Sequence, residues 1–381
     1  MAKVYVLRGQ DRVFGFTLDE QGTNLPLQYG PWTPFKTIEL HHDEPYQGVD
    51  VSACLDDISK YGFHLTAAHK RITDLAVGSV PVKGERALVL GSGGATGNAW
   101  LIGVIAGLFE AGLDVTKADL IIGTSAGLTA AAQITSATPT QLLADILSAA
   151  PEQRKGPTRA DGEPVPIGPA ANHMEIISAI IAASEDAADM RRRMGAAALE
   201  TDAAAHSSAQ AQWRATIAAR LPSQLWPQQR MLIPAVDAHT GEPVVFDRHS
   251  GVDLVDAVAA STSNGFGVPP YSIGDRRYIN GGYRADVNAD LAAGYARVLV
   301  LSPFSGRSLH PLDWGTTHLA AQADELRAGG SRVETIFPDN NSENALGGGM
   351  EVMDLSRRRP SAQAGYNQGI ALAEQLTEFW R

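Results

Sequence analysis

A serine set between two glycines carries the clearest chemical signal in this chain, at residues 123–127 (GTSAG). A serine hydroxyl is a weak nucleophile, so catalysis needs a sharp turn that presents it to a base and to an oxyanion hole. An apolar, strand-like run directly precedes the motif and a helical stretch follows it. This order predicts that Ser125 is a nucleophile on a strained turn, where Gly123 and Gly127 avoid clashes.

A second glycine-rich loop, from Gly91 to Gly97 (GSGGATG), also joins a predicted strand to a predicted helix. Backbone N–H groups in such a loop favour negative charge, either a dinucleotide pyrophosphate or the oxyanion of an acyl-transfer intermediate. The dinucleotide fingerprint G-x-G-x-x-G needs glycine where Thr96 stands, and the next strand leads to the serine motif rather than to an acidic residue. This favours an oxyanion hole, with a nucleotide loop or a purely structural turn as the alternatives.

A third segment, residues 277–282 (RYINGG), ends another predicted strand with Asn280, Gly281 and Gly282. The three segments in this order resemble the patatin-like phospholipase family, whose third motif is D-G-G or D-G-A and supplies the Asp of a catalytic Ser-Asp dyad. Residues 288–292 (NADLA) also resemble the family's continuation. The resemblance covers about residue 85 to the C-terminus and does not extend to residues 1–75.

The resemblance implies a serine-dependent acyl hydrolase of the esterase or phospholipase type that needs no metal or organic cofactor. Ser125 matches the nucleophile, and the backbone of Gly93, Gly94 and Ala95 matches the oxyanion hole. Asn280 stands at the position of the dyad Asp. Two further departures are Thr96, where the family often has Lys or Arg, and Asn264-Gly265, near which the family usually has Pro.

The amide at Asn280 matters because it is far too weak a base to accept the serine proton. General base catalysis contributes about 10²- to 10⁴-fold, so turnover is expected to fall by about that factor while the nearly isosteric side chain preserves the site. Three hypotheses remain open. The amide is an introduced inactivating substitution, or the chain is a natural non-catalytic relative that binds lipid or regulates, or another carboxylate such as Asp275 or Asp286 acts instead.

An ordinary α/β-hydrolase with a Ser-Asp-His triad in chain order is a second alternative. Asp286 or Asp290 could precede His310 or His318 in that order. Neither histidine follows a convincing strand end, so both are interpreted as surface residues.

Alternating strands and helices from residue 86 onward predict an α/β fold with a mostly parallel sheet flanked by helices. A helix is expected from Asn98 to Ala111, closed by Gly112, with Gly103 and Gly107 letting it lie close to the sheet. The predicted strands are Ala87–Leu90, Leu120–Ile122, Met231–Val236, Pro243–Phe246, Arg277–Asn280, Val298–Leu301 and Val333–Phe337.

The Ala-rich stretch around residues 139–221 is predicted to be a helical insertion in the hydrolase domain of residues 86–381. This insertion, which contains a loop with several Pro and Gly at residues 154–169, could cap the site or line an acyl channel, and plain helical scaffold is the alternative. Residues 1–75 are predicted to form a separate small α+β domain of unknown role, with Trp32 and Phe35 in its core, followed by a linker over residues 76–85.

Composition limits the partners. The chain of 381 residues is 44% hydrophobic and 19% charged, which is typical of a globular protein, and its net charge of −11 disfavours nucleic acid. Its one cysteine, Cys54, excludes an internal disulfide, and the histidines show no metal-ligand spacing. Without a long apolar run a cytoplasmic location is expected. Expected partners are an acyl lipid or small ester, with peripheral membrane contact and oligomer formation left open.

Overall fold

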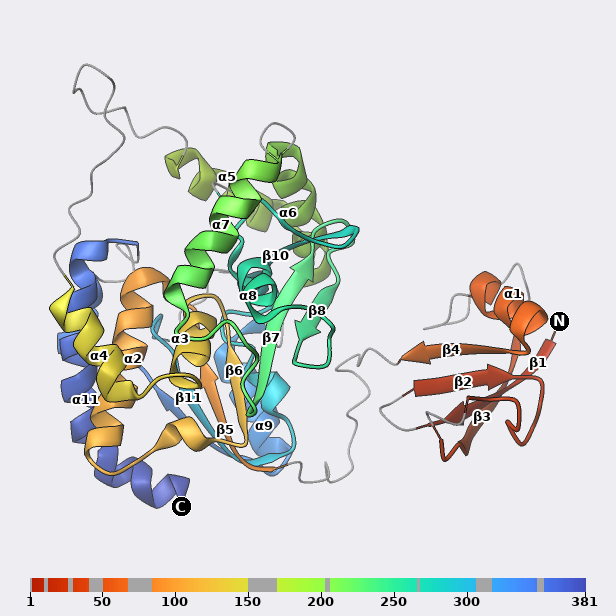
Figure 1. The fold of residues 1–381 in the computed structure, drawn as a ribbon, viewed down its shortest axis with the longest axis horizontal. Helices are drawn as coiled ribbons and strands as arrows, with labels where there is room; N and C mark the ends of the chain where they lie inside the picture. The colour runs from red at the N-terminus through yellow and green to blue at the C-terminus, as the bar shows by residue number, and fades with distance from the viewer. Residues whose placement is uncertain are drawn as a thin grey trace. The chain divides into compact units, whose positions relative to one another are not determined.

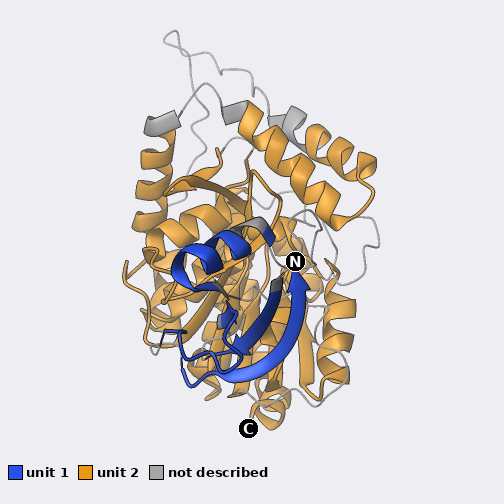
Figure 2. Ribbon diagram, turned by 90° about the vertical axis from the view of Figure 1, so that its right-hand side faces the viewer, with its two compact units in different colours: residues 1–78 blue, residues 79–381 orange. Residues whose placement is uncertain are grey.

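The computed structural model describes residues 2–9, 13–26, 30–40, 51–67, 84–149, 170–202, 206–265, 268–305, 317–347 and 353–381. The chain divides into two compact units, Met1–Gly78 and Ser79–Arg381 (Figure 2). Most of the linker expected at residues 76–85 lies outside the described residues. Its last two residues, Gly84 and Glu85, already belong to the first strand of the second unit.

The first unit is a small antiparallel sheet with a helix packed on it. The strand order is β3-β1-β2-β4. The elements are β1 (Ala2–Arg8), β2 (Val13–Thr17), β3 (Thr33–Leu40), α1 (Val51–Tyr61) and β4 (Phe63–Ala67). Apolar side chains of β1, β2 and β3 meet α1 in one core, which includes the fully buried Cys54.

The expectation that Phe35 anchors this core is wrong. Its side chain is 54% exposed. Successive residues of a strand face opposite sides of a sheet, and Phe35 has the phase of the exposed Thr37 and Glu39, whereas Ile38 and Leu40 are buried. The ring of Phe35 instead meets Phe14 edge-on, with centroids 5.1 Å apart.

The second unit is built on a mixed, mostly parallel eight-stranded sheet (Figure 1), and the predicted fold class is confirmed. The strand order is β12-β11-β5-β6-β7-β10-β9, with β8 paired to β7. The five strands from β12 to β7 run parallel, and β8, β9 and β10 pair antiparallel with their neighbours. The strands are β5 (Gly84–Leu90), β6 (Leu120–Gly123), β7 (Arg230–Asp237), β8 (Pro243–Phe246), β9 (Tyr271–Ile273), β10 (Arg276–Asn280), β11 (Tyr295–Leu301) and β12 (Arg332–Ile336).

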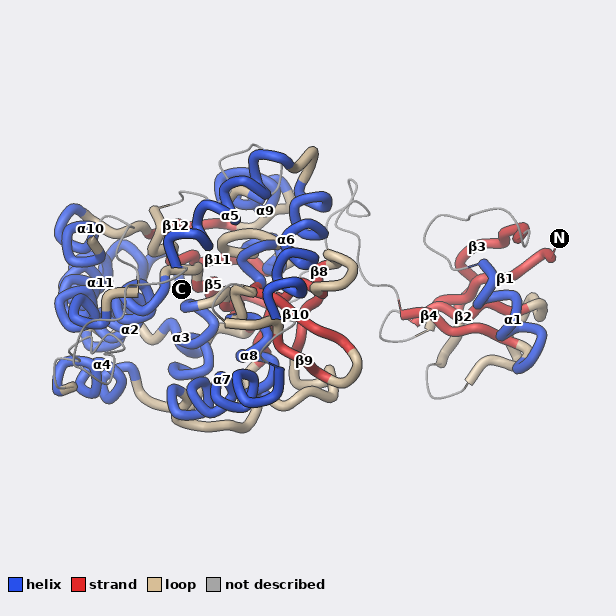
Figure 3. The backbone as a smooth tube through the Cα atoms, turned by 90° about the horizontal axis from the view of Figure 1, so that it is seen from above, coloured by secondary structure: helices blue, strands red, loops and turns tan. Residues whose placement is uncertain are grey.

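Helices cover both faces of this sheet (Figure 3). The apolar run of β5 therefore serves two cores: Leu88 and Leu90 face one core, and Ala87 and Val89 face the other. This explains why the strand shows no polar alternation in the sequence. The helices are α2 (Gly94–Glu110), α3 (Ala126–Ile134), α4 (Pro139–Ser148), α5 (Ala170–Ala183), α6 (Ala187–Asp202), α7 (His206–Arg220), α8 (Leu254–Thr262), α9 (Leu319–Ala328), α10 (Asn340–Leu346) and α11 (Arg358–Trp380).

Helix α2 makes its closest contact with the C-terminal helix α11, which lies beside it in Figure 1. The expectation that Gly103 and Gly107 bring α2 close to the sheet is wrong. A Cβ at Gly103 would lie 2.1 Å from the carbonyl oxygen of Ala362, and one at Gly107 would lie 2.2 Å from that of Tyr366. Gly365 and Gly369 make the reciprocal approach to α2. Glycine is required on both helices because their backbones touch.

Replacing Gly369 with alanine is expected to lower the free energy of unfolding. The new Cβ would lie 2.2 Å from the carbonyl oxygen of Val104, so the helices must separate. Overpacking costs about 1–3 kcal/mol, and the gain of about 1 kcal/mol that alanine has in a helix offsets it only in part. Urea unfolding measures the loss. Glu374→Ala, at an exposed position of the same helix, is the control, and an equal stability of both variants would contradict this contact.

Candidate active site

The strand–turn–helix around Ser125 has the geometry of a nucleophile elbow. Ser125 stands between β6 and α3 with φ 53° and ψ −112°, a conformation that a residue with a side chain rarely adopts. A Cβ at Gly127 would lie 2.1 Å from the carbonyl oxygen of Leu90, and one at Gly123 would lie 2.4 Å from Cα of Leu128. Both glycines are therefore required by backbone contacts, and the turn holds Ser125 at the carboxyl edge of the parallel strands.

The glycine loop at residues 91–97 lies at the carboxyl end of the neighbouring strand β5. Helix α2 begins within it, at Gly94, four residues before the expected start at Asn98. A Cβ at Gly93 would lie 2.7 Å from Cβ of Pro303 and 2.8 Å from Cα of Gly97, so this position has no room for a side chain. The first N–H groups of a helix have no partner within it and carry partial positive charge. Gly94 and Ala95 line the same cavity as Ser125.

Asn280 ends β10 and its amide contacts the serine directly. Its Nδ2 donates to Oγ of Ser125 at 3.2 Å and to Oδ1 of Asn264 at 2.9 Å, and its Oδ1 accepts from the backbone N–H of Gly282 at 2.8 Å. Asn280 is buried, with 7% of its surface exposed. Two residues 155 positions apart in the chain thus meet at the distance that proton transfer requires.

Asn264 holds the amide of Asn280 in this orientation and is itself held from behind. The hydroxyl of Tyr283 donates to the backbone carbonyl of Asn264 at 2.8 Å. Burial raises the pKa of the Tyr283 phenol well above its usual range, so the phenol keeps the proton that it donates. Because both N–H bonds of the Asn280 amide have acceptors, Ser125 receives a hydrogen bond from this side chain and gives none to it.

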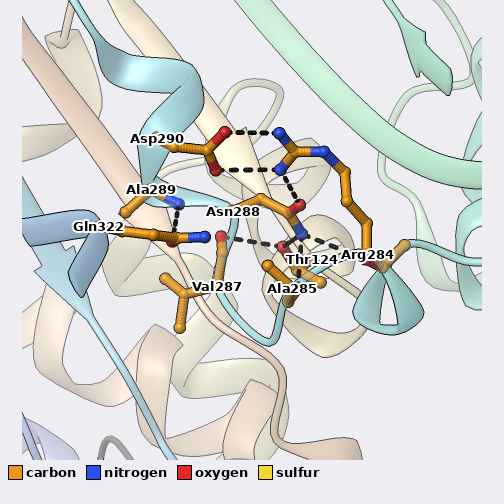
Figure 4. A network of polar contacts seen from close by, with 9 residues as sticks. Thr124, Arg284, Ala285, Val287, Asn288, Ala289, Asp290 and Gln322 are labelled. Carbon is orange, nitrogen blue, oxygen red and sulfur yellow. Dashed lines mark hydrogen bonds and ion pairs between the residues drawn. The ribbon is translucent and has the colours of Figure 1, made fainter. Parts of the chain in front are cut away.

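A buried polar network ties the serine turn to the loop that follows Asn280 (Figure 4). Asn288, in a left-handed conformation with φ 59°, donates from Nδ2 to the hydroxyl of Thr124 at 3.0 Å and to the carbonyl oxygens of Gly281 and Ala285. The Thr124 hydroxyl donates in turn to the carbonyl oxygen of Val287 at 3.0 Å. The network therefore fixes the position of Thr124, which precedes Ser125, relative to Gly281, which follows Asn280.

An ion pair anchors the same loop. Arg284 Nη1 donates to Oδ1 of Asn288 at 2.5 Å and to Oδ1 of Asp290 at 2.9 Å, and Arg284 Nη2 contacts Oδ2 of Asp290. Both charged side chains are buried, with 8% and 6% of their surfaces exposed. Sequence analysis considered Asp290 only as the acid of an alternative histidine triad, and it did not predict this ion pair. The available signal was the run of residues 288–292 after the third motif, which carries an amide and a carboxylate two positions apart.

A cavity of about 710 Å³ opens on Ser125. Besides Ser125, Gly94 and Ala95, its wall includes Asn264 and apolar side chains of three helices and a following turn. These apolar side chains are Ile102 of α2, Leu142 and Ile146 of α4, Trp213 of α7 and Leu221. Helices α4 and α7 belong to the predicted insertion, so that insertion lines the site. Its loop at residues 154–169 lies outside the described residues.

Comparison with known proteins decides the family. The family model for patatin-like phospholipases matches residues 88–293, which is more than half of the chain. The chain belongs to the patatin-like phospholipase family. The resemblance inferred from the three motifs is confirmed.

Other comparisons add little to the assignment of this patatin-like phospholipase. No curated protein matches it. Among solved structures, it is similar to the type III effector protein ExoU, with 15% sequence identity and a TM-score of 0.26. The match covers 76% of this chain and 54% of the ExoU chain, so this chain spans about half of ExoU. A likeness at this TM-score is too weak to argue from.

In this patatin-like phospholipase the alternative carboxylates do not line the described wall of the cavity. Asp275 is exposed in the turn before β10, at the end of that strand opposite to Asn280. Asp286 is buried, and its backbone carbonyl accepts from the N–H of Ser92 at 3.2 Å. Neither contributes to the described wall of the cavity, whose acidic residue is Asp145 of α4.

A histidine triad also lacks support in this patatin-like phospholipase. His318 precedes α9 and Asp290 is paired with Arg284, while His310 lies outside the described residues. The part of the cavity wall that the structure describes contains no histidine. Within the described ranges no cluster of histidine, cysteine or acidic side chains could hold a metal ion, and no described helix is long and apolar enough to span a membrane.

Proposed function

We propose that the cavity binds an acyl ester and that Ser125 is its nucleophile, with position 280 as the site of the general base. The observation that carries the proposal is the 3.2 Å contact between Oγ of Ser125 and Nδ2 of Asn280. In the reaction, Oγ attacks the ester carbonyl carbon, the π electrons move to the carbonyl oxygen, and the hydroxyl proton passes to the base and then to the leaving alkoxide. Water repeats these steps on the acyl-enzyme.

The developing oxyanion is stabilised by the backbone of Gly93, Gly94 and Ala95. Gly93 precedes α2, and Gly94 and Ala95 are its first two residues. N–H groups without helical partners and the helix dipole both favour negative charge there. Gly94 has φ 62°, so glycine lets the backbone turn sharply as it enters the helix. The glycine loop follows β5, whereas Asn280 ends β10. An amide at position 280 therefore leaves this stabilisation of the oxyanion in place.

With Asn280 the two side chains at positions 125 and 280 keep their geometry, but the pair has no general base. The amide nitrogen of Asn280 carries hydrogen rather than a basic lone pair, and its carbonyl oxygen accepts from Gly282. The serine proton must therefore leave to water or to the leaving group. We infer that the chain turns over esters about 10²- to 10⁴-fold more slowly than it would with a carboxylate at this position.

The cavity suits an acyl chain. Its volume of about 710 Å³ lies within the range of small-molecule sites, about 300–1,000 Å³. Ile102, Leu142 and Ile146 give part of its wall an apolar surface on which burial of a hydrocarbon chain is favourable. An ester of a medium-length fatty acid is the substrate class that this shape favours.

Covalent labelling tests the proposal. A fluorophosphonate reacts with an activated serine, and mass spectrometry of the digested protein locates the label. In the Asn280→Asp variant we expect a label on Ser125 that forms about 10²- to 10⁴-fold faster than in the unchanged chain. Asn280→Asp with Ser125→Ala is the control and should take no label in this segment. A label on a different residue, or none in the Asn280→Asp variant, would overturn the proposal.

A further inference from the structure

We propose that this cavity binds the free carboxylate of an acyl chain, the product of ester hydrolysis, and holds it more tightly because Asn280 is an amide. The inference rests on the proposed function, since it takes the cavity to be the acyl site. The inference adds a ligand class to the proposed function. In a hydrolase with a carboxylate beside its serine, that carboxylate repels the acidic product, whereas the amide of Asn280 carries no charge. The evidence is the hydrogen-bond polarity of the groups around Ser125 and the charge of the wall.

The groups that meet at Ser125 are arranged as donors. Asn280 Nδ2 donates to Oγ of Ser125, so the serine's own hydrogen must point to another acceptor. Gly94 and Ala95 begin α2 and line the same cavity, and the first N–H groups of a helix have no partner within it. The acceptor oxygen of Asn280 is occupied by the N–H of Gly282. A carboxylate has two oxygens that only accept, and it fits this set.

The amide orientation is fixed from behind, which makes the donor role of Asn280 a property of the fold. Oδ1 of Asn264 accepts from Nδ2 of Asn280 at 2.9 Å, and the N–H of Gly282 can only meet Oδ1. If the Asn280 amide turned over, its Nδ2 would face the N–H of Gly282, and its Oδ1 would face Oδ1 of Asn264. Nδ2 therefore stays on the side of Ser125.

The charge of the cavity wall also favours an anion. Of the described wall residues, Arg220 and Arg358 are cationic and Asp145 is anionic, in a chain whose net charge is −11. The described wall thus carries a formal charge of +1, from two cations and one anion. An aspartate at position 280 would add a negative charge 3.2 Å from Ser125, about 5–6 Å from a carboxylate bound there.

Isothermal titration of decanoate and of the matching primary alcohol, at pH 8 on the full chain, tests the inference. We expect the unchanged chain to bind decanoate, and Asn280→Asp to weaken that binding by about 10- to 100-fold, because like charges at this separation repel. Binding of the uncharged alcohol should stay the same in both proteins. The alcohol therefore separates loss of charge complementarity from loss of the cavity.

Gln133→Glu adds the same charge at another residue of the cavity wall and serves as the matched control, for which we expect a smaller loss of decanoate affinity. Equal binding of decanoate to the unchanged chain and Asn280→Asp, or no binding of decanoate to the unchanged chain, would overturn the inference. Neither result would overturn the proposed function if Asn280→Asp still hydrolyses esters through Ser125. If Asn280→Asp does not hydrolyse esters but still binds decanoate more weakly than the unchanged chain does, the proposed function is contradicted and the inference is not.

Discussion

Replacing Asn280 with aspartate is expected to raise the hydrolysis of p-nitrophenyl esters by about 10²- to 10⁴-fold. The side chains are nearly isosteric, and the N–H of Gly282 can donate to a carboxylate oxygen as it does to the amide oxygen at 2.8 Å. The other carboxylate oxygen would replace Nδ2 at 3.2 Å from Oγ of Ser125 and accept its proton. Turnover of both proteins under saturating ester measures the effect.

The amide of Asn264 must turn over for this substitution, because its Oδ1 now accepts from Asn280. The turned amide would donate to the new carboxylate, which stabilises the ionised form that the mechanism needs. Gln133→Glu puts one carboxylate elsewhere on the same wall and controls for charge alone, so it should give no gain. If Asn280→Asp turns over esters as slowly as the unchanged chain, a carboxylate at position 280 does not form a catalytic dyad with Ser125.

Breaking the ion pair of Arg284 is expected to give the largest loss of stability among single changes near the site. Arg284→Met leaves the carboxylate of Asp290 buried at 6% exposure without a cation, and removing one partner of a buried pair costs about 3–5 kcal/mol. Oδ1 of Asn288 also loses its donor at 2.5 Å. Urea unfolding followed by tryptophan fluorescence measures the change in the free energy of unfolding.

A surface pair provides the comparison. Lys117 Nζ lies 3.8 Å from Oδ2 of Asp114, and the lysine side chain is 81% exposed, so Lys117→Met should cost no more than about 1 kcal/mol. If Arg284→Met loses no more stability than this control, the buried pair does not hold the loop. In the Asn280→Asp background, Arg284→Met should also lower ester turnover, because Asn288 then no longer fixes Thr124 and Gly281.

The sequence was most informative where a local pattern has one structural solution. An unbroken apolar run followed by G-x-S-x-G predicts a buried parallel strand and a strained turn, and Ser125 has the expected positive φ. A strand was also predicted over Pro243–Phe246, and β8 has the same bounds. In both cases the residues that determine the structure are neighbours in the chain.

What the sequence could not predict depends on contacts between distant segments. The partner of Gly103 and Gly107 is α11, more than two hundred residues later, and a glycine pair on one helix does not say which surface approaches it. The start of α2 at Gly94 was missed because glycine is a poor helix former, and here the needs of the loop outweigh that propensity. The donor role of Asn280 depends on Asn264 and Gly282, whose orientation only the fold reveals.

Ester turnover by four proteins tests the central claim most directly: the unchanged chain, Ser125→Ala, Asn280→Asp, and the two changes combined. Because the 3.2 Å contact makes the two positions one catalytic unit, we predict that Asn280→Asp raises turnover by about 10²- to 10⁴-fold when Ser125 is present and by nothing when it is absent. A gain that survives Ser125→Ala would contradict the account, because the nucleophile would then lie elsewhere in the chain.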